Sequence, residues 1–242
     1  MKSHRSGILL LFVAIALKPW ASSLASEAMK AQADASFQAL VAEGERLWTQ
    51  SPDPSNPVAC ATCHRDPAKT RGWAASFPKF KPLPPPHARV MTLLQANAEA
   101  VERHYRLRDP LSAATAITAY LTSLGADVPI SPGISAGQPV FSTRMQALAE
   151  SVLRGERLYT ARCGHCHQVG AVAPSITAFP RVGEGRAESL ERFIERHQSL
   201  DQHLSWDGQA TADVIAYLMS QVAGRPVGLE AHQASKEAKE GS

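Results

Sequence analysis

The sequence predicts an all-α protein built as two tandem helical domains. Apolar residues recur at helical spacing over residues 37–48, 113–124, 148–159 and 212–222, whereas no segment shows a convincing strand-like alternation. In addition, short blocks of sequence recur in the same order in both halves of the 242-residue chain, as expected for a duplicated unit.

The first segment, residues 1–25, has the pattern of a signal peptide. Basic residues precede an apolar run over residues 8–17, and small residues ending at Ala25 then offer a cleavage site. An uncleaved anchor is the alternative, but a membrane span needs roughly 20 apolar residues, and Lys18 interrupts this run. We therefore expect export to the periplasm, cleavage after Ala25 and no stable membrane span in the mature protein.

The charge balance gives no support for nucleic acid or anionic lipid as a partner. The chain carries 25 basic and 22 acidic side chains, and the leader holds Lys2, Arg5 and Lys18 but no acidic residue. The mature chain is therefore close to neutral, and we find no basic tract in it.

The repeats predict a first domain over residues 34–124 and a second over 141–224. Residues 125–140 between them are rich in Gly, Pro and Ser and carry few charges, which is typical of a linker. Residues 225–242 are expected to be a disordered tail, because they contain Ala, Glu, Lys and Gly and no motif. Each domain then has a size common for an independent unit.

Two short motifs use every cysteine of the chain: Cys60-Ala-Thr-Cys63-His64 and Cys163-Gly-His-Cys166-His167. The pattern C-x-x-C-H is the attachment signature of haem c. Its spacing suits the chemistry, because two thiols of one turn form thioethers with the porphyrin and the adjacent histidine binds the iron. We therefore expect two covalently attached haem c groups with His64 and His167 as proximal ligands.

Three other uses of these cysteines explain the pattern less well. A zinc site with four cysteines would leave the trailing histidines unexplained. A thioredoxin-like redox pair needs a βαβ context that the sequence does not show. Two structural disulfides fit the expected oxidising compartment and the cysteine count alone.

Repeated blocks also lie on either side of the motifs. Upstream, residues 44–48 match residues 155–159, and downstream, residues 119–121 match residues 216–218. This layout resembles class I c-type cytochromes, in which an N-terminal helix leads to the haem motif and a C-terminal helix crosses back over it. The resemblance covers nearly all of the mature chain. It implies that glycines 44 and 155 permit close helix packing, and that four aromatic residues belong to the cores: Trp48, Tyr120, Tyr159 and Tyr217.

Histidines recur as well, because Val101-Glu-Arg-His104 matches Ile194-Glu-Arg-His197. A histidine at the end of a helix can simply favour the helix dipole, but recurrence in both halves favours His104 and His197 as distal iron ligands. Methionine is the other common distal ligand. Met91 and Met219 lie at non-equivalent places, and we interpret them as packing residues.

The segments that end in these histidines also resemble part of two other families. One comprises small oxygen-binding haem proteins with an Asn distal ligand, and the other comprises dihaem cytochromes of thiosulfate oxidation with a Cys ligand. This chain departs from both at the ligand, and the four thioethers leave no cysteine for the iron. The neighbouring Arg103 and Arg196 fit haem propionate binding and a solvated helix surface equally well.

These features favour electron transfer between redox partner proteins through two six-coordinate haems, by an electron carrier or electron-transfer subunit rather than an enzyme. One alternative is a diatomic-gas-binding haem protein with a weak distal histidine. The other is a haem-based redox enzyme, either a sulfur-compound oxidoreductase or a peroxidase-like enzyme. Such an enzyme needs an open iron and nearby acid and base groups, and we could assign no cluster to that role.

Overall fold

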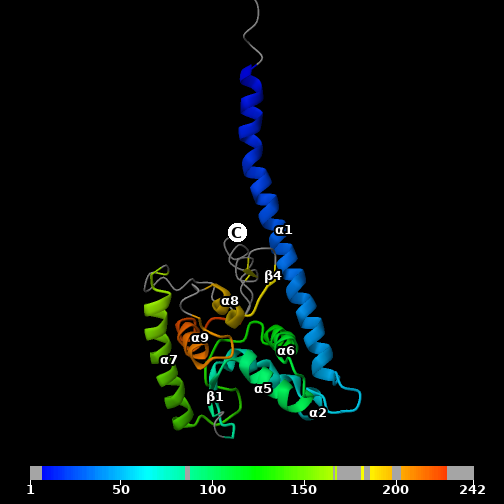
Figure 1. Ribbon diagram of the computed structural model, residues 1–242, viewed down its shortest axis with the longest axis vertical. Helices are drawn as coiled ribbons and strands as arrows, with labels where there is room; N and C mark the ends of the chain where they lie inside the picture. The colour runs from blue at the N-terminus through cyan, green and yellow to red at the C-terminus, as the bar shows by residue number, and fades with distance from the viewer. Residues whose placement is uncertain are drawn as a thin grey trace, which may run out of the picture.

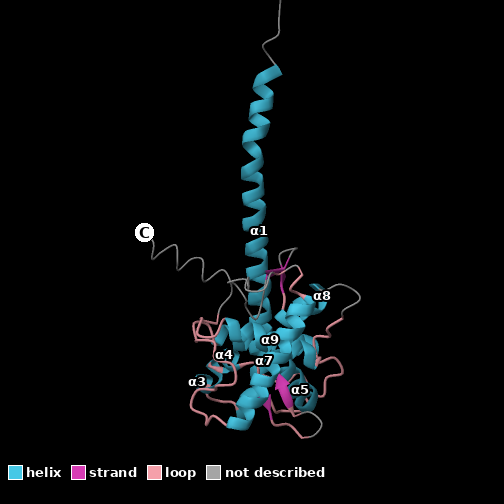
Figure 2. Cartoon of the chain, turned by 90° about the vertical axis from the view of Figure 1, so that its left-hand side faces the viewer, coloured by secondary structure: helices cyan, strands magenta, loops and turns pink. Residues whose placement is uncertain are grey.

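The computed structural model describes residues 7–84, 88–165, 167, 181–182, 186–197 and 203–227. Within these ranges the elements follow in the order α1 (Gly7–Thr49), α2 (Cys60–Cys63), α3 (Pro67–Arg71), α4 (Trp73–Ser76), β1 (Lys79–Lys81), β2 (Arg89–Met91), α5 (Leu93–Tyr105), α6 (Leu111–Leu124), α7 (Ser142–Arg162), β3 (Arg181–Val182), β4 (Arg186–Ala187), α8 (Leu190–His197) and α9 (Gln209–Gln221). The chain is mostly helical, as predicted (Figures 1 and 2).

Two short antiparallel strand pairs were not predicted. In the pair β1–β2, Lys79 lies opposite Met91 and Lys81 lies opposite Arg89. In the pair β3–β4, Arg181 lies opposite Ala187. Strands of two or three residues are too short to give a recognisable alternation in the sequence.

Helix α1 continues through the segment that we interpret as a leader. It runs for 43 residues, and Figure 1 shows its N-terminal part projecting away from the other helices. The expected cleavage site after Ala25 precedes Ala33, the first buried residue among those of α1 whose side chains are described. No helix of the described residues is both long enough and apolar enough to cross a membrane.

Two pairs of helices cross at glycine residues. A Cβ atom on Gly44 of α1 would lie 2.0 Å from the carbonyl oxygen of Ala116 in α6. On Gly155 of α7, a Cβ atom would lie 1.9 Å from the carbonyl oxygen of Asp213 in α9. Any side chain at either position would therefore force the helices apart. The close helix packing expected at both glycines is confirmed.

The segment expected to be a linker is held by backbone hydrogen bonds. Ser131 N donates to the carbonyl oxygen of Ala75, and Ile130 N donates to that of Arg225, both at 2.8 Å. Val227 N donates to the carbonyl oxygen of Val128, also at 2.8 Å. The described chain thus stays bonded through Val227, beyond the boundary predicted at residue 225, and residues 228–242 lie outside the described part.

A shared core joins elements from both halves of the sequence. Ala75 of α4 and Ile130 of the 125–140 segment form one buried cluster with Leu190 of α8 and with Ile215 and Met219 of α9. Helix α7 also contacts β1 and β2, and α1 contacts β3 and β4. Elements from the two halves of the sequence are therefore packed against one another.

Candidate functional site

The first C-x-x-C-H motif forms the one-turn helix α2, with His64 directly after it. The hydroxyl of Tyr105 lies 3.3 Å from Cys60 Sγ, accepts a hydrogen bond from Cys60 N at 3.2 Å and donates one to the carbonyl oxygen of Leu47 at 2.5 Å. Burial raises the pKa of the Cys60 thiol. Tyr105 therefore joins the motif to both α1 and α5.

Tyr105 was not among the residues predicted from the sequence. It follows His104 directly, but the matching position of the second repeat is Gln198, so a comparison of the repeats gave no signal. Its buried position, only 3% exposed, is what reveals its role.

Aromatic rings surround the imidazole of His64. The ring centroid of Trp73 lies 4.9 Å from that of His64, and the centroid of Trp48 lies 5.9 Å from it. Partial burial lowers the pKa of His64, and the charges of Lys81 and His104 lower it further. A lowered pKa favours the neutral imidazole, which is the form that binds a metal.

A cavity of about 300 Å³ lies beside His64. Its aromatic wall includes Trp73, Phe77 and Phe80, and Met145 of α7 also lines it. The volume is at the lower end of the range for small-molecule and cofactor pockets. Among the described cysteines, Cys60 and Cys63 are free thiols. Thiols on a short turn, an adjacent neutral histidine and an aromatic wall fit a covalently attached haem.

Helix α5 places His104 on the side that faces this cavity. Thr92 caps the helix, accepting a hydrogen bond from Gln95 N at 3.2 Å, and Gln95 Oε1 accepts one from Thr92 N, also at 3.2 Å. Asn97 and Ala100 of α5 line the cavity. His104 follows Ala100 by four residues and so lies on the same helix face, one turn further on.

The end of α5 is fixed as well. Arg106 adopts the left-handed conformation, with φ of 52°, and terminates the helix. Asn56 Nδ2 donates a hydrogen bond to the carbonyl oxygen of His104 at 2.8 Å. The side chain of His104 remains exposed, and its charge acts on the pKa of His64. The structure therefore brings these two predicted ligands into the same region.

The second motif repeats this arrangement around His167. The ring centroid of Tyr159 lies 6.5 Å from that of His167 and 5.4 Å from that of Tyr217, as Trp48 lies beside both His64 and Tyr120 at the first motif. Cys163 is half-buried, whereas Cys166 and residues 168–180 lie outside the described residues. Tyr159 and Tyr217 are buried, as expected for core residues.

His167 and His197 lie close together, with ring centroids 6.2 Å apart and an interplanar angle of 53°. A metal ion held at about 2 Å by one nitrogen of each of two opposed imidazoles places the centroids roughly 6 Å apart. The ring of Phe193, one turn earlier on α8, stacks on His197 at 4.8 Å. The spacing of the two histidines therefore fits two ligands that would hold one metal ion between them.

The two methionines that we set aside are buried as packing residues. Met91 of β2 is 1% exposed, and Met219 of α9 is 7% exposed within the core cluster described above. The arginines beside the distal candidates are engaged with carboxylates. Arg103 Nη2 donates to Glu99 Oε1 and Arg196 Nη2 donates to Glu188 Oε2, both at 2.7 Å. These contacts favour the interpretation of both arginines as part of a solvated helix surface.

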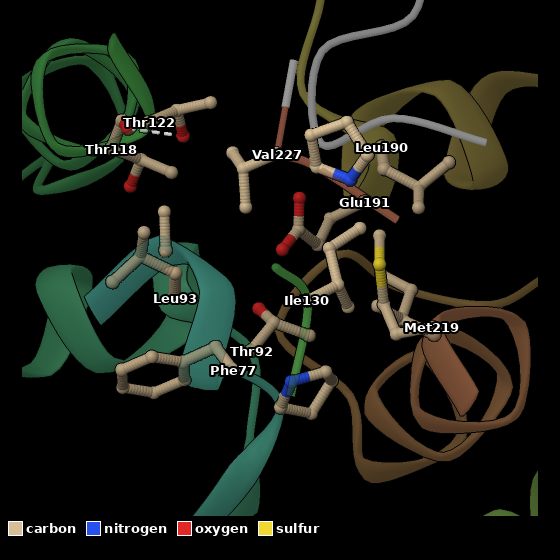
Figure 3. A pocket seen from close by; sticks show the side chains of 14 residues that line it. Phe77, Thr92, Leu93, Thr118, Thr122, Ile130, Leu190, Glu191, Met219 and Val227 are labelled. Atoms are coloured by element: carbon tan, nitrogen blue, oxygen red, sulfur yellow. Dashed lines mark hydrogen bonds between the residues drawn. The ribbon is translucent and has the colours of Figure 1, made fainter. Parts of the chain in front are cut away.

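A smaller cavity of about 50 Å³ lies at the start of α8. Figure 3 shows the carboxyl group of Glu191 pointing into it, between Thr92 and Val227. Burial raises the pKa of Glu191, and hydrogen bonds from the hydroxyls of Thr92 and Ser189 offset part of this effect. A buried acid thus lies on the first turn of the helix that ends in His197.

No protein-family model and no curated protein matches this chain. Among solved structures, the crystal structure of SoxXA from P. pantotrophus is similar, with a TM-score of 0.61 and 16% sequence identity. The match covers 78% of this chain and 75% of that chain. SoxXA is a cytochrome c complex, and at this identity the likeness concerns the fold: the chain has a cytochrome c-like fold.

Proposed function

We propose that this protein is an exported dihaem cytochrome c that carries electrons between redox partner proteins in the periplasm. One haem c is attached in each of two domains, residues 34–124 and 141–224. The observation that carries the proposal is the repeated constellation. In each half, two helices cross at a glycine, an aromatic side chain lies against the histidine of C-x-x-C-H, and a second histidine follows from the end of a later helix.

The attachment residues are the four cysteines of the two motifs. The thiols of Cys60 and Cys63 form thioethers with one porphyrin, and those of Cys163 and Cys166 form them with the other. Bound in this way, haem supplies a reversible one-electron couple whose potential depends on its ligands and surroundings. The short turn of each motif would hold its histidine, His64 or His167, as a ligand of the haem iron.

We assign His104 and His197 to the opposite faces of the two haems. The 6.2 Å separation between the rings of His167 and His197 supports this assignment for the second haem. For the first haem, the support is the position of His104 on the cavity-facing side of α5 and its electrostatic effect on His64. With two histidines from the protein holding each iron, a bound haem would supply electron transfer and would leave no site for a substrate.

A sulfur-compound oxidoreductase is the second candidate, favoured by the fold likeness to SoxXA. Such an enzyme requires an iron that its substrate can reach. A peroxidase-like enzyme or a gas-binding protein has the same requirement. The binding of carbon monoxide to the reduced protein therefore separates electron transfer from all three.

The test uses the full chain produced in a host that matures c-type cytochromes. We expect the mass of the mature protein to include two haems, and a Cys163→Ser/Cys166→Ser variant to retain one. We also expect no carbon monoxide difference spectrum and two reversible one-electron steps. Fewer than two haems in the wild type would contradict the dihaem proposal, and stoichiometric carbon monoxide binding would contradict electron transfer as the function.

A further inference from the structure

Three cationic side chains line the cavity beside His64: Lys79 and Lys81 of β1, and Arg144 of α7. The lysines belong to the first repeat, and Arg144 belongs to the first turn of the helix that opens the second. The cavity is therefore completed by a residue far away in the sequence.

Lys79 is held in place by two hydroxyl groups. Its ammonium donates to Ser76 Oγ and Ser135 Oγ, both at 2.9 Å, and lies 4.4 Å from the ring centroid of Phe77. A lysine ammonium has three N–H donors, so one donor remains for a ligand. Burial lowers the pKa of Lys79 to about 8, and the charge of Lys81 contributes to this shift.

The cluster also lacks an anionic partner in the part of the chain that the structure describes. Burial lowers the pKa of Lys81, and the charge of Arg144 lowers it further. The guanidinium of Arg144 lies over the ring of Phe141, 4.3 Å from its centroid. Across the described residues, no Asp or Glu pairs with any of the three cations. Gathering like charges in a half-buried site is unfavourable unless an anion joins them.

We propose that Lys79, Lys81 and Arg144 bind the two propionate carboxylates of the haem attached at Cys60 and Cys63. This inference rests on the proposed function, because it requires a haem at the first motif. Arginine offers a planar set of donors that suits a carboxylate, whereas a lysine ammonium acts as a compact charge. Through Arg144, the first haem is then bonded to the helix that carries the second repeat.

The cluster also changes the reduction potential of that haem. Three positive charges near the propionates stabilise the reduced haem relative to the oxidised haem, because oxidation adds a positive charge to the same site. Removing one cation lowers the potential of the first haem only.

The test compares the matured wild-type protein with the variants Arg144→Gln, Lys79→Gln and Arg144→Lys. Arg103→Gln is the matched control, because Arg103 is an arginine beside the same haem whose guanidinium is paired with Glu99. Mass spectrometry first establishes that two haems are attached. A spectroelectrochemical titration then gives both reduction potentials.

We expect Arg144→Gln and Lys79→Gln each to lower the reduction potential of the first haem by about 59 mV. At a fixed applied potential, this corresponds to an about tenfold lower ratio of reduced to oxidised haem for one electron. The potential of the second haem should stay unchanged in these variants. In Arg103→Gln and Arg144→Lys, both potentials should stay close to those of the wild type. Infrared redox difference spectra of haem labelled with ¹³C in its propionates should show a carboxylate band that moves in Arg144→Gln and stays in place in Arg103→Gln.

Two results would contradict propionate binding by these cations while leaving the dihaem proposal intact. In the first, both haems are attached, but neither the two potentials nor the carboxylate band moves in Arg144→Gln and Lys79→Gln. In the second, added inorganic sulfate shifts the potential of the first haem in the wild type but not in Arg144→Gln. That result would show that the cations bind an anion from solution and not the propionates. A wild-type protein without haem at the first motif would refute both proposals.

Discussion

Replacing Gly44 by alanine tests the helix crossing that positions the first motif. The new Cβ atom would lie 2.0 Å from the carbonyl oxygen of Ala116 and 2.8 Å from the Cβ atom of Tyr120. Because ordinary contacts at such an atom begin near 3.4 Å, α1 and α6 must separate by about 1 Å or more. Overpacking of this kind costs about 3 kcal/mol at the upper end of its usual range.

The net effect on stability is smaller, because alanine favours a helix over glycine by about 1 kcal/mol. We therefore expect Gly44→Ala to lower the free energy of unfolding by about 2 kcal/mol. Gly155→Ala should behave alike, since its Cβ atom would lie 1.9 Å from the carbonyl oxygen of Asp213. Urea denaturation of the matured protein, followed by far-ultraviolet circular dichroism, measures both changes.

Gly72→Ala is the control for this experiment. A Cβ atom there would meet no atom within 4 Å, and the φ of Gly72 is −80°, which alanine adopts freely. Its stability should differ from the wild type by less than about 1 kcal/mol, because the entropic gain of alanine is offset by the loss of glycine at a helix cap. Wild-type stability in Gly44→Ala would refute the close crossing.

Three further predictions concern buried polar groups. Tyr105→Phe removes the hydrogen bond to the carbonyl oxygen of Leu47 and should cost about 1–2 kcal/mol in urea denaturation, whereas unchanged stability would show that this bond contributes nothing. Asp213→Asn removes the charge that accepts hydrogen bonds from Arg154 at 2.8 and 3.0 Å. It should cost about 2 kcal/mol, and an equally stable variant would contradict the importance of this pair. Since burial raises the pKa of Glu191, the folded protein holds this proton after the unfolded chain has lost it. Its stability should then fall as pH rises above about 4.5 towards the folded-state pKa. Glu191→Gln should remove that part of the fall, and identical pH profiles for variant and wild type would contradict the raised pKa.

The sequence predicted the helices from apolar residues at helical spacing, and the repeated blocks carried the resemblance to class I c-type cytochromes that implied the two glycine crossings. A glycine one turn before an aromatic residue appears in both halves, and both copies lie at a crossing of the same kind. The short pair β1–β2 was not predicted, because three residues such as Lys79–Lys81 carry too little periodicity to identify a strand.

Features that differ between the halves were not predictable in this way. Tyr105, the cation cluster at the first cavity and the hydrogen bonds of Asp213 have no counterpart that a comparison of repeats could reveal. The 125–140 segment has the composition of a flexible linker, yet its bonds to Ala75 and Arg225 depend on partners distant in the sequence. The composition of a segment indicates only its own conformational preferences. The conformation of this segment is determined by hydrogen bonds to distant parts of the chain.

The most direct test of the central claim is the electron paramagnetic resonance spectrum of the oxidised, matured protein. The wild type should show two low-spin signals and no high-spin haem. His104→Ala and His197→Ala should each convert a different one of these signals to high spin, while His203→Ala, at an exposed position, should change neither. A high-spin signal in the wild type, or low-spin signals that survive both ligand substitutions, would contradict the assignment of two bis-histidine haems.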